Sequence, residues 1–236
     1  MRSSRAGAGG VLGGSLIMSA LVVAGLFLAP VAQAAPIPAP EPVAAALAGF
    51  ESDPQAAMSE WAGWAATQPM RYSINDKPRQ FRSICQIDAA GTSLCDDFIR
   101  IIGRGGRDMG MKRTSEVITT ADRKQYFRDV PLKKWNANKF GANTNPISNT
   151  GRFYSYNPWQ PWGTPGISIS TSIGADGYRE VRVSNPAPSD DQPSVTVTRV
   201  SPDGSKAELI EQTMKGKNLS VNRISIAEVA PIKIPR

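Results

Sequence analysis

Polar and apolar residues alternate along most of the chain after residue 80. Nine segments show this period of two, and turn-forming residues such as Gly174-Ala175-Asp176-Gly177 and Pro202-Asp203-Gly204 separate several of them. Successive strands joined by short turns are typical of an antiparallel meander. The predicted strands are 80–88, 93–101, 112–120, 125–130, 167–173, 178–184, 195–200, 207–214 and 218–226. The segment 207–214 also suits a short helix by propensity, but its place between two turn signals favours a strand.

One helical pattern precedes the strands. Asp53-Pro54 is a good helix start, because Asp caps the free N–H groups and Pro is tolerated at the first helical position. Apolar residues then follow at helical spacing, with Trp61 and Trp64 one step apart around the helix. A helical region followed by about nine strands predicts an α+β fold, with a curved, half-barrel-like antiparallel sheet. The two tryptophans are interpreted either as core residues or as ligand contacts.

The N-terminus has the pattern of a secretory signal. Arg2 and Arg5 precede an apolar run over residues 11–29, and Ala32-Gln33-Ala34 matches a cleavage site. The alternative is an uncleaved membrane anchor, since the run is long enough to span a bilayer. We therefore expect a signal peptide over residues 1–34, a Pro-rich spacer over 35–42 and one α+β domain over 43–236.

The two cysteines, Cys85 and Cys95, lie on either side of the turn Ala89-Ala90-Gly91. A three-residue hairpin loop with Gly at its left-handed position pairs Asp88 with Thr92 and places the cysteines directly opposite each other. The short Cα separation of such a pair permits a disulfide. A zinc site is excluded as an interpretation because the chain has no histidine and too few ligands, so we expect no metal. A disulfide implies an oxidising compartment, in agreement with export.

Residues 136–166 show no period and are rich in Asn, Pro and Gly. A long structureless loop inside a compact domain is typical of function or disorder, and disordered segments are poor in aromatic residues. This segment is predicted to be an ordered covering loop, because it holds six of the seventeen aromatic residues of the chain: Phe140, Phe153, Tyr154, Tyr156, Trp159 and Trp162.

Catalytic chemistry is not indicated. Without histidine, a Ser-His-Asp or Cys-His site cannot form. The sequence GRGGRDMG at 103–110 lacks the Lys-Ser/Thr of a phosphate loop and is interpreted as a turn. The adjacent carboxylates Asp96-Asp97 and Asp190-Asp191 should point to opposite faces of a strand. We therefore expect a binding protein, not an enzyme, with no cofactor.

The charge of the exported chain is basic. Of 27 Lys and Arg residues, two belong to the signal segment, which leaves 25 against 20 Asp and Glu. An exported basic protein is expected to meet an anionic envelope surface, not nucleic acid, although solubility alone explains a modest charge equally well. Two binding classes remain: a carrier of an apolar or amphiphilic molecule such as a lipid, and a carbohydrate- or wall-binding structural protein that uses the loop 136–166.

Two segments, 115–135 and 197–235, resemble the LolA/LppX–LprG type of lipid and lipoprotein carriers of the cell envelope. The first contains a strand, a turn and a Tyr-bearing strand that leads to a Trp, and the second resembles their closing strands. The resemblance implies a half-barrel that holds acyl chains, with helices at its mouth and no catalytic residues. This chain lacks the lipobox cysteine and carries the Asn-rich aromatic loop in place of a Leu-rich helix. The expected ligand contacts are Trp61, Trp64, Tyr126, Trp135, Trp159 and Trp162.

Overall fold

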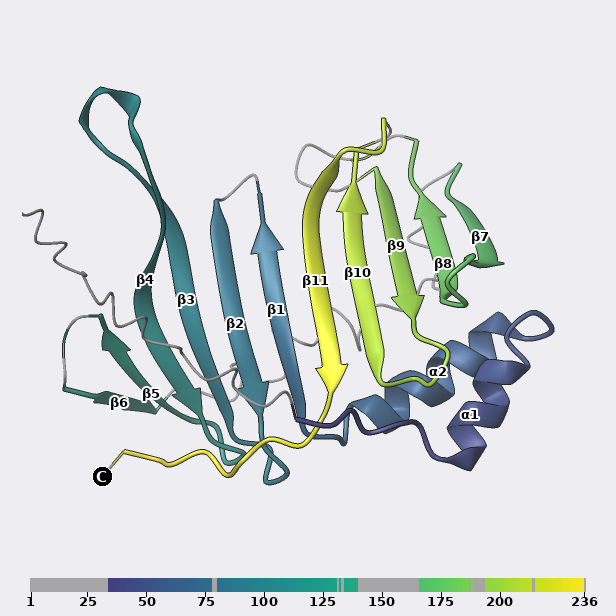
Figure 1. The fold of residues 1–236 in the computed structure, drawn as a ribbon, viewed down its shortest axis with the longest axis horizontal. Coiled ribbons are helices and arrows are strands. Elements are labelled where there is room, and N and C mark those ends of the chain that lie inside the picture. The colour runs from purple at the N-terminus through teal and green to yellow at the C-terminus, as the bar shows by residue number, and fades with distance from the viewer. Residues whose placement is uncertain are drawn as a thin grey trace, which may run out of the picture. The chain divides into compact units, whose positions relative to one another are not determined.

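A computed structural model describes residues 34–77, 80–130, 132, 134–139, 166–186, 188, 194–213 and 215–235. The chain from Ala34 onward forms one compact unit. Its strands form a single antiparallel sheet of eleven strands, in the order β6-β5-β4-β3-β2-β1-β11-β10-β9-β8-β7 (Figure 1). The predicted α+β class with a large antiparallel sheet is therefore confirmed.

The structure contains all nine predicted strands and two further ones, β1 and β6. The helices are α1 (Glu41–Ala48) and α2 (Pro54–Ala65). The strands are β1 (Met70–Asp76), β2 (Phe81–Ile87), β3 (Ser93–Ile102), β4 (Asp108–Thr119), β5 (Lys124–Asp129), β6 (Asn136–Lys139), β7 (Ser168–Ile173), β8 (Arg179–Ser184), β9 (Val195–Val200), β10 (Lys206–Gln212) and β11 (Asn218–Ile226). A short 3₁₀ turn, Arg104–Gly106, joins β3 to β4.

The sheet joins two meanders. Neighbours in sequence pair with each other within β1–β6 and within β7–β11, and the two groups meet where β1 pairs with β11. Met70 lies opposite Ile226 in this central pair, and both side chains are buried. The pair connects segments about 150 residues apart, which explains why the sequence pattern alone did not reveal β1 as part of the sheet centre.

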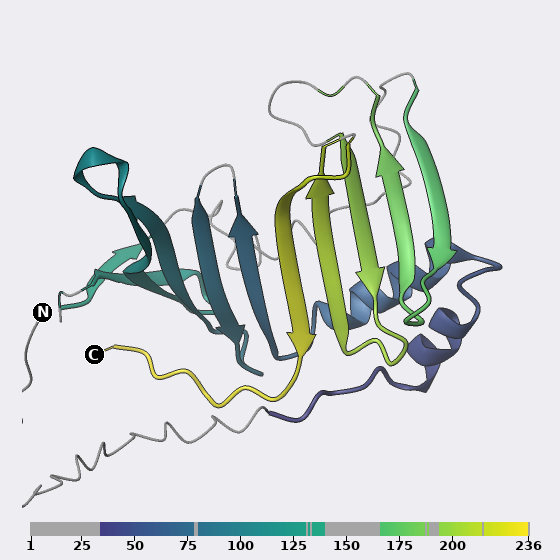
Figure 2. The same cartoon turned by 45° about the horizontal axis from the view of Figure 1, so that its top comes forward.

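The predicted helix α2 begins as expected. The Asp53 side chain accepts a hydrogen bond of 2.9 Å from the backbone N–H of Ala56. Both helices lie at the β7–β11 end of the sheet (Figures 1 and 2). Their buried face packs on the sheet around Leu47, Phe50 and Trp61. Arg179 of β8 donates a 2.9 Å hydrogen bond to the carbonyl oxygen of Leu47, which fastens α1 to the sheet.

Residues 35–42, the predicted Pro-rich spacer, hydrogen-bond with the folded part of the chain. Pro36 forms a bridge with Ala227, and the backbone N–H groups of Ile37 and Ala39 donate to the carbonyl oxygens of Ile226 and Asp203. Prolines alternate with these residues at 36, 38 and 40, so the remaining N–H groups point the same way and can bond the domain. The helix α1 already begins at Glu41.

Cys85 and Cys95 are disulfide-bonded, as predicted. They lie opposite each other in the β2–β3 ladder, with a Cα–Cα distance of 4.1 Å. The turn also has the expected geometry, because Asp88 donates its N–H to the carbonyl oxygen of Thr92 and Gly91 has a φ of 78°. The disulfide thus fixes the register of the β2–β3 hairpin.

The predicted signal segment and most of the aromatic loop lie outside the described residues. Within the described part, β6 occupies the start of that loop, where four residues pair with β5. Among the helices that the structure describes, none combines the length and the hydropathy needed to cross a membrane.

Candidate functional site

The structure does not gather the four described members of the predicted ligand contacts into one site. Trp61 is 1% exposed in the core, and Trp64 packs against the same core. Tyr126 lies in β5 and Trp135 just before β6, at the other end of the sheet. Five strands separate β5 from β10, whose preceding turn contacts Trp61. Trp159 and Trp162 lie outside the described residues.

The sheet register shows which residues share the helix-side face. Directly opposed residues point to the same face, so one row runs from Val200 through Ala207, Ile224, Tyr72, Cys85 and Cys95 to Val117 and Phe127. The row is buried from β9 to β3 but only partly buried in β4 and β5. The helices lie at the far end of this row (Figures 1 and 2). The apolar face therefore continues beyond the described helices.

We call this continuation the inner face of β2–β5. One row is apolar and contains the disulfide, Val117 and Phe127. Another contains Phe81 and Ile99, which is 41% exposed, with Lys112 opposite Ile99 on β4. A polar row lies between them and consists of Ser83, Asp97, Ser115 and Asp129. This sequence of rows makes the inner face amphiphilic.

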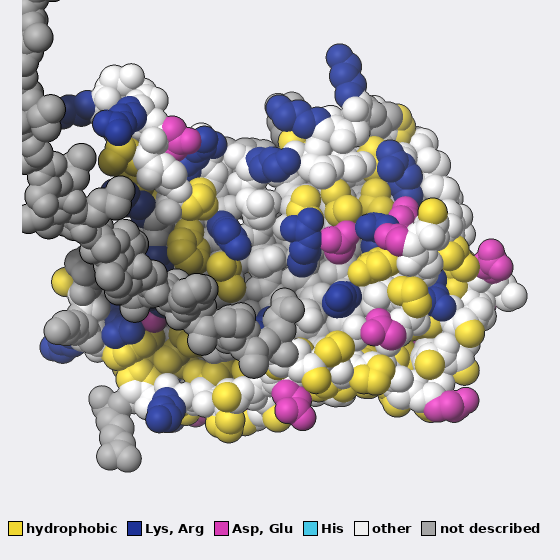
Figure 3. Space-filling model, viewed as in Figure 1, with side chains coloured by type: hydrophobic (Ala, Val, Ile, Leu, Met, Phe, Trp, Pro, Cys, Tyr) yellow, Lys and Arg dark blue, Asp and Glu magenta, His cyan; other side chains and the backbone are white. Residues whose placement is uncertain are grey.

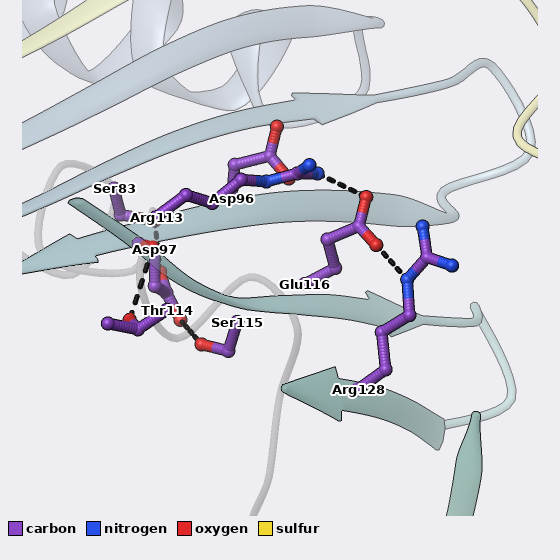
Figure 4. A network of polar contacts seen from close by, with 8 residues as sticks. All are labelled: Ser83, Asp96, Asp97, Arg113, Thr114, Ser115, Glu116 and Arg128. Atoms are coloured by element: carbon purple, nitrogen blue, oxygen red, sulfur yellow. Dashed lines mark hydrogen bonds and ion pairs between the residues drawn. The ribbon is translucent and has the colours of Figure 1, made fainter. Parts of the chain in front are cut away.

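Asp97 is the centre of the polar row (Figure 4). Its carboxylate accepts hydrogen bonds from the hydroxyls of Ser83 (2.8 Å) and Ser115 (3.2 Å). The Tyr72 hydroxyl lies 3.4 Å from the Cys95 sulfur, to which it donates because a disulfide sulfur carries no hydrogen. Burial, and secondarily the Asp97 charge, raise the pKa of Tyr72, so its hydroxyl stays protonated. The row thus offers hydroxyls and two carboxylates, Asp97 and Asp129.

A β-bulge at Thr114 determines which residues of β4 lie on the opposite face of the sheet, which we call the outer face. The register shifts where Asp97 pairs with Ser115 but Phe98 pairs with Arg113, and the Thr114 hydroxyl donates to the carbonyl oxygen of Asp97. Strand residues three apart normally face opposite sides, but one extra residue brings them to the same side. Arg113 and Glu116 can therefore form an ion pair.

The outer face of β3–β5 carries a chain of ion pairs (Figure 4). Arg113 bridges Asp96 and Glu116, and Arg128 bonds the second oxygen of Glu116. The hydrogen bond from Arg128 and the charge of Arg113 lower the pKa of Glu116 against the opposing effect of burial. Arg128 also lies 4.7 Å from the ring centroid of Trp135, a cation–π contact. Trp135 is thus held by a structural network.

A second ion-pair network lies on the outer face at the other end of the sheet. Arg199 contacts Asp176, Glu180 and Glu208, and Glu208 also contacts Arg223. Figure 3 shows basic and acidic side chains alternating there over β8–β11. Because each of these carboxylates has a guanidinium partner, this face is interpreted as a charged, solvated surface.

The adjacent carboxylates Asp96 and Asp97 lie on opposite faces of β3. Asp96 contacts Arg113 on the outer face, whereas Asp97 contacts the serines on the inner face, as predicted for neighbours in a strand. Asp190 and Asp191 lie outside the described residues. Among the described residues, no cluster of three or more metal-ligating side chains occurs.

Comparison with known proteins assigns no family. No protein-family model and no curated protein matches the chain. Among solved structures, the chain resembles an uncharacterized conserved protein from Thermus thermophilus, with a TM-score of 0.39 and 6% sequence identity. The match covers 73% of this chain and 87% of that protein. Evidence for a function therefore comes from the surfaces of the molecule.

Proposed function

We propose that this protein is a non-catalytic, exported protein of the cell envelope that binds an apolar or amphiphilic, lipid-like molecule. The inner face of β2–β5 is the proposed binding surface. The observation that carries the proposal is the apolar row of the core, which continues past the described helices to the partly exposed Val117 and Phe127.

The alternation of rows suits an amphiphile. Rows on one face of a strand are two residues apart, so the polar row lies roughly 7 Å from each apolar row. An acyl chain lying along Val117 and Phe127, or along Ile99 and Phe81, places a polar group within reach of Ser83 and Ser115. Each large side chain that the ligand covers contributes about 1.5–3 kcal/mol at most.

Asp97 restricts the head group. Its carboxylate faces the same surface and already accepts two hydroxyl hydrogen bonds. A second negative charge placed beside it is repelled, so the surface favours neutral or zwitterionic head groups over free fatty acids. We expect a ligand with hydroxyl or zwitterionic character.

The compartment is part of the proposal. The Cys85–Cys95 disulfide supports an oxidising space, and the signal-like N-terminus supports export. The half-barrel curvature that the carrier resemblance implies also belongs to the proposal. A carbohydrate-binding role depends on Trp159 and Trp162, outside the described residues, and stays a prediction.

Native mass spectrometry of the secreted protein, followed by organic extraction, tests the proposal. We expect a bound mass that is lost on extraction and is identified as a neutral or zwitterionic lipid. Protein recovered from the medium without such a mass, and unable to acquire one from added lipid, contradicts the proposal.

A further inference from the structure

The β3–β4 hairpin continues beyond the rest of the sheet. The last pair between β2 and β3 is Phe81 with Ile99, and the last pair between β4 and β5 is Ser115 with Asp129. Residues 101–112, which we call the extension, have strand partners only within this hairpin among the described strands. The extension rises beyond β1 and β2 in both views (Figures 1 and 2). The strand from Ile99 to the turn at Arg104 corresponds to about 17 Å.

The extension exposes large apolar side chains. Ile102, Met109 and Met111 are 52%, 46% and 41% exposed. An isolated two-stranded ribbon is marginally stable in water, and soluble proteins protect exposed strand edges with charged residues. These three apolar side chains at the outer end of the ribbon lie outside the buried core of the described residues.

The extension is also cationic. Arg104, Arg107 and Lys112 are exposed and have no acidic partner among the described residues. Its one acidic residue, Asp108, accepts a 3.1 Å hydrogen bond from Arg100. That bond, with the N–H of Gly110, lowers the pKa of Asp108 to about 2, so the pair persists. Free positive charge and apolar side chains thus occupy the same ribbon.

Charge is distributed unevenly between the two edges of the sheet, and the basic edge is the one that carries the extension. β1, β3 and β10 run in the same direction, so the turns after them share one edge of the sheet with the extension. Exposed lysines Lys77, Lys215 and Lys217 lie in those turns. Figure 3 shows basic side chains gathered along this upper edge. Residues 34–70 contain four acidic residues and no Lys or Arg. Their helix α2 contacts the β9–β10 turn, which lies at the opposite edge of the sheet.

We propose that the extension docks this protein onto an anionic phospholipid bilayer, with Ile102, Met109 and Met111 in the interface and Arg104, Arg107 and Lys112 at the lipid phosphates. The inference rests on the proposed function and deepens it, since it names the surface at which an envelope protein would meet its lipid. Interfacial elements bury apolar side chains by about 5–10 Å and use Lys and Arg for attraction to anionic lipids. A soluble polyanion offers partners to the cations alone, so the exposed apolar residues favour a bilayer.

Vesicle co-sedimentation with the secreted protein tests the docking. We expect binding to vesicles of phosphatidylcholine mixed with phosphatidylglycerol, weakened by salt, and none to phosphatidylcholine alone. Arg104→Gln with Arg107→Gln should lower the partition coefficient about thirtyfold, as expected for two cations at an anionic surface. The control variant, Lys206→Gln with Lys233→Gln, removes the same charge at the opposite edge and should leave the partition coefficient unchanged.

A second variant tests how much the exposed apolar side chains contribute to vesicle binding. Ile102→Asn with Met109→Asn should weaken binding to the mixed vesicles about tenfold or more while leaving the melting temperature and the disulfide unchanged, since both side chains are exposed. Docking is refuted if the mixed vesicles bind no protein, if the arginine variant and the lysine variant lose equal affinity, or if the apolar variant binds like the wild type, as a polyanion site would. The proposed function fails separately, if no soluble lipid binds.

Discussion

Trp61 donates its indole N–H to the backbone carbonyl oxygen of Gly204 over 2.8 Å, across 143 residues of sequence. The bond fastens α2 to the β9–β10 turn, and the indole is almost fully buried there. A tryptophan so placed fills the core, which is one of the two interpretations that the helical pattern allowed. We therefore place the ligand on β2–β5 and not against this helix.

The close approach of the helices to Gly204 predicts a steric requirement. Gly204 has a φ of 71°, and a Cβ added there would lie 2.8 Å from the Cβ of Ala39 and 3.2 Å from Leu47. Gly204→Ala should therefore destabilise the protein by about 2–4 kcal/mol, from backbone strain and overpacking together. Urea unfolding followed by tryptophan fluorescence measures the loss.

Gly216→Ala is the matched control for that substitution. Its φ is 76°, but the added Cβ would have open space. We expect a loss of about 1–2 kcal/mol from strain alone. Equal losses at both positions would show that the helices do not press on Gly204.

The disulfide should stabilise the domain without being essential to its fold. It closes a loop with a sequence separation of 10, for which the chain-entropy account gives about 2–3 kcal/mol. Reductant should lower the melting temperature by roughly 5–10 °C. The variant with Cys85→Ala and Cys95→Ala should show no response to reductant. Two thiols that react with a labelling reagent in the untreated protein would contradict the assignment.

The ion pairs of Glu116 predict a pH dependence. Its pKa is lowered in the folded protein, chiefly by the hydrogen bond from Arg128. A lowered folded-state pKa means stability that is fully present above the ordinary glutamate value of about 4.5 and is lost as the pH falls through the folded-state pKa. Glu116→Gln should cost roughly 1–3 kcal/mol at neutral pH and flatten this acid-side loss. The melting temperature measured from neutral pH down to the acid range checks both effects.

Glu60→Gln is the control for the acid titration. Glu60 is exposed on α2 and has no ion-pair partner among the described residues. Its removal should leave the pH profile of the melting temperature unchanged. If the melting temperature of both variants fell with pH as steeply as that of the wild type, the ion pairs of Glu116 would contribute nothing to stability in acid.

Local signals in the sequence were sufficient for most elements. The period of two located nine strands, and the Gly91 turn predicted the cysteine register. The strand β1 was missed although Met70, Tyr72 and Ile74 alternate, because no Gly-containing turn signal precedes it and its partner β11 is distant in sequence. The helix α1 was missed because its first residues overlap the Pro-rich segment.

The binding surface could not be predicted, for physical reasons. Which strand residues share a face across β1 and β11 depends on a long-range register that local patterns do not encode. The bulge at Thr114 has no Gly or Pro to mark it, yet it decides that Arg113 joins Glu116 on the outer face. The apolar and polar rows thus became one surface only through tertiary pairing.

Ile99 and Ile84 provide the most direct test of the proposed ligand surface. They lie on adjacent strands with nearly equal exposure, 41% and 40%, but Ile99 belongs to the inner face of β2–β5 and Ile84 to the outer face. The measurement is a titration with a fluorescent short-chain phosphatidylcholine below its self-association concentration. We predict saturable binding that Ile99→Asn weakens by about ten- to a hundredfold and Ile84→Asn leaves intact. Absence of saturable binding, or equal weakening by the two substitutions, would contradict the account.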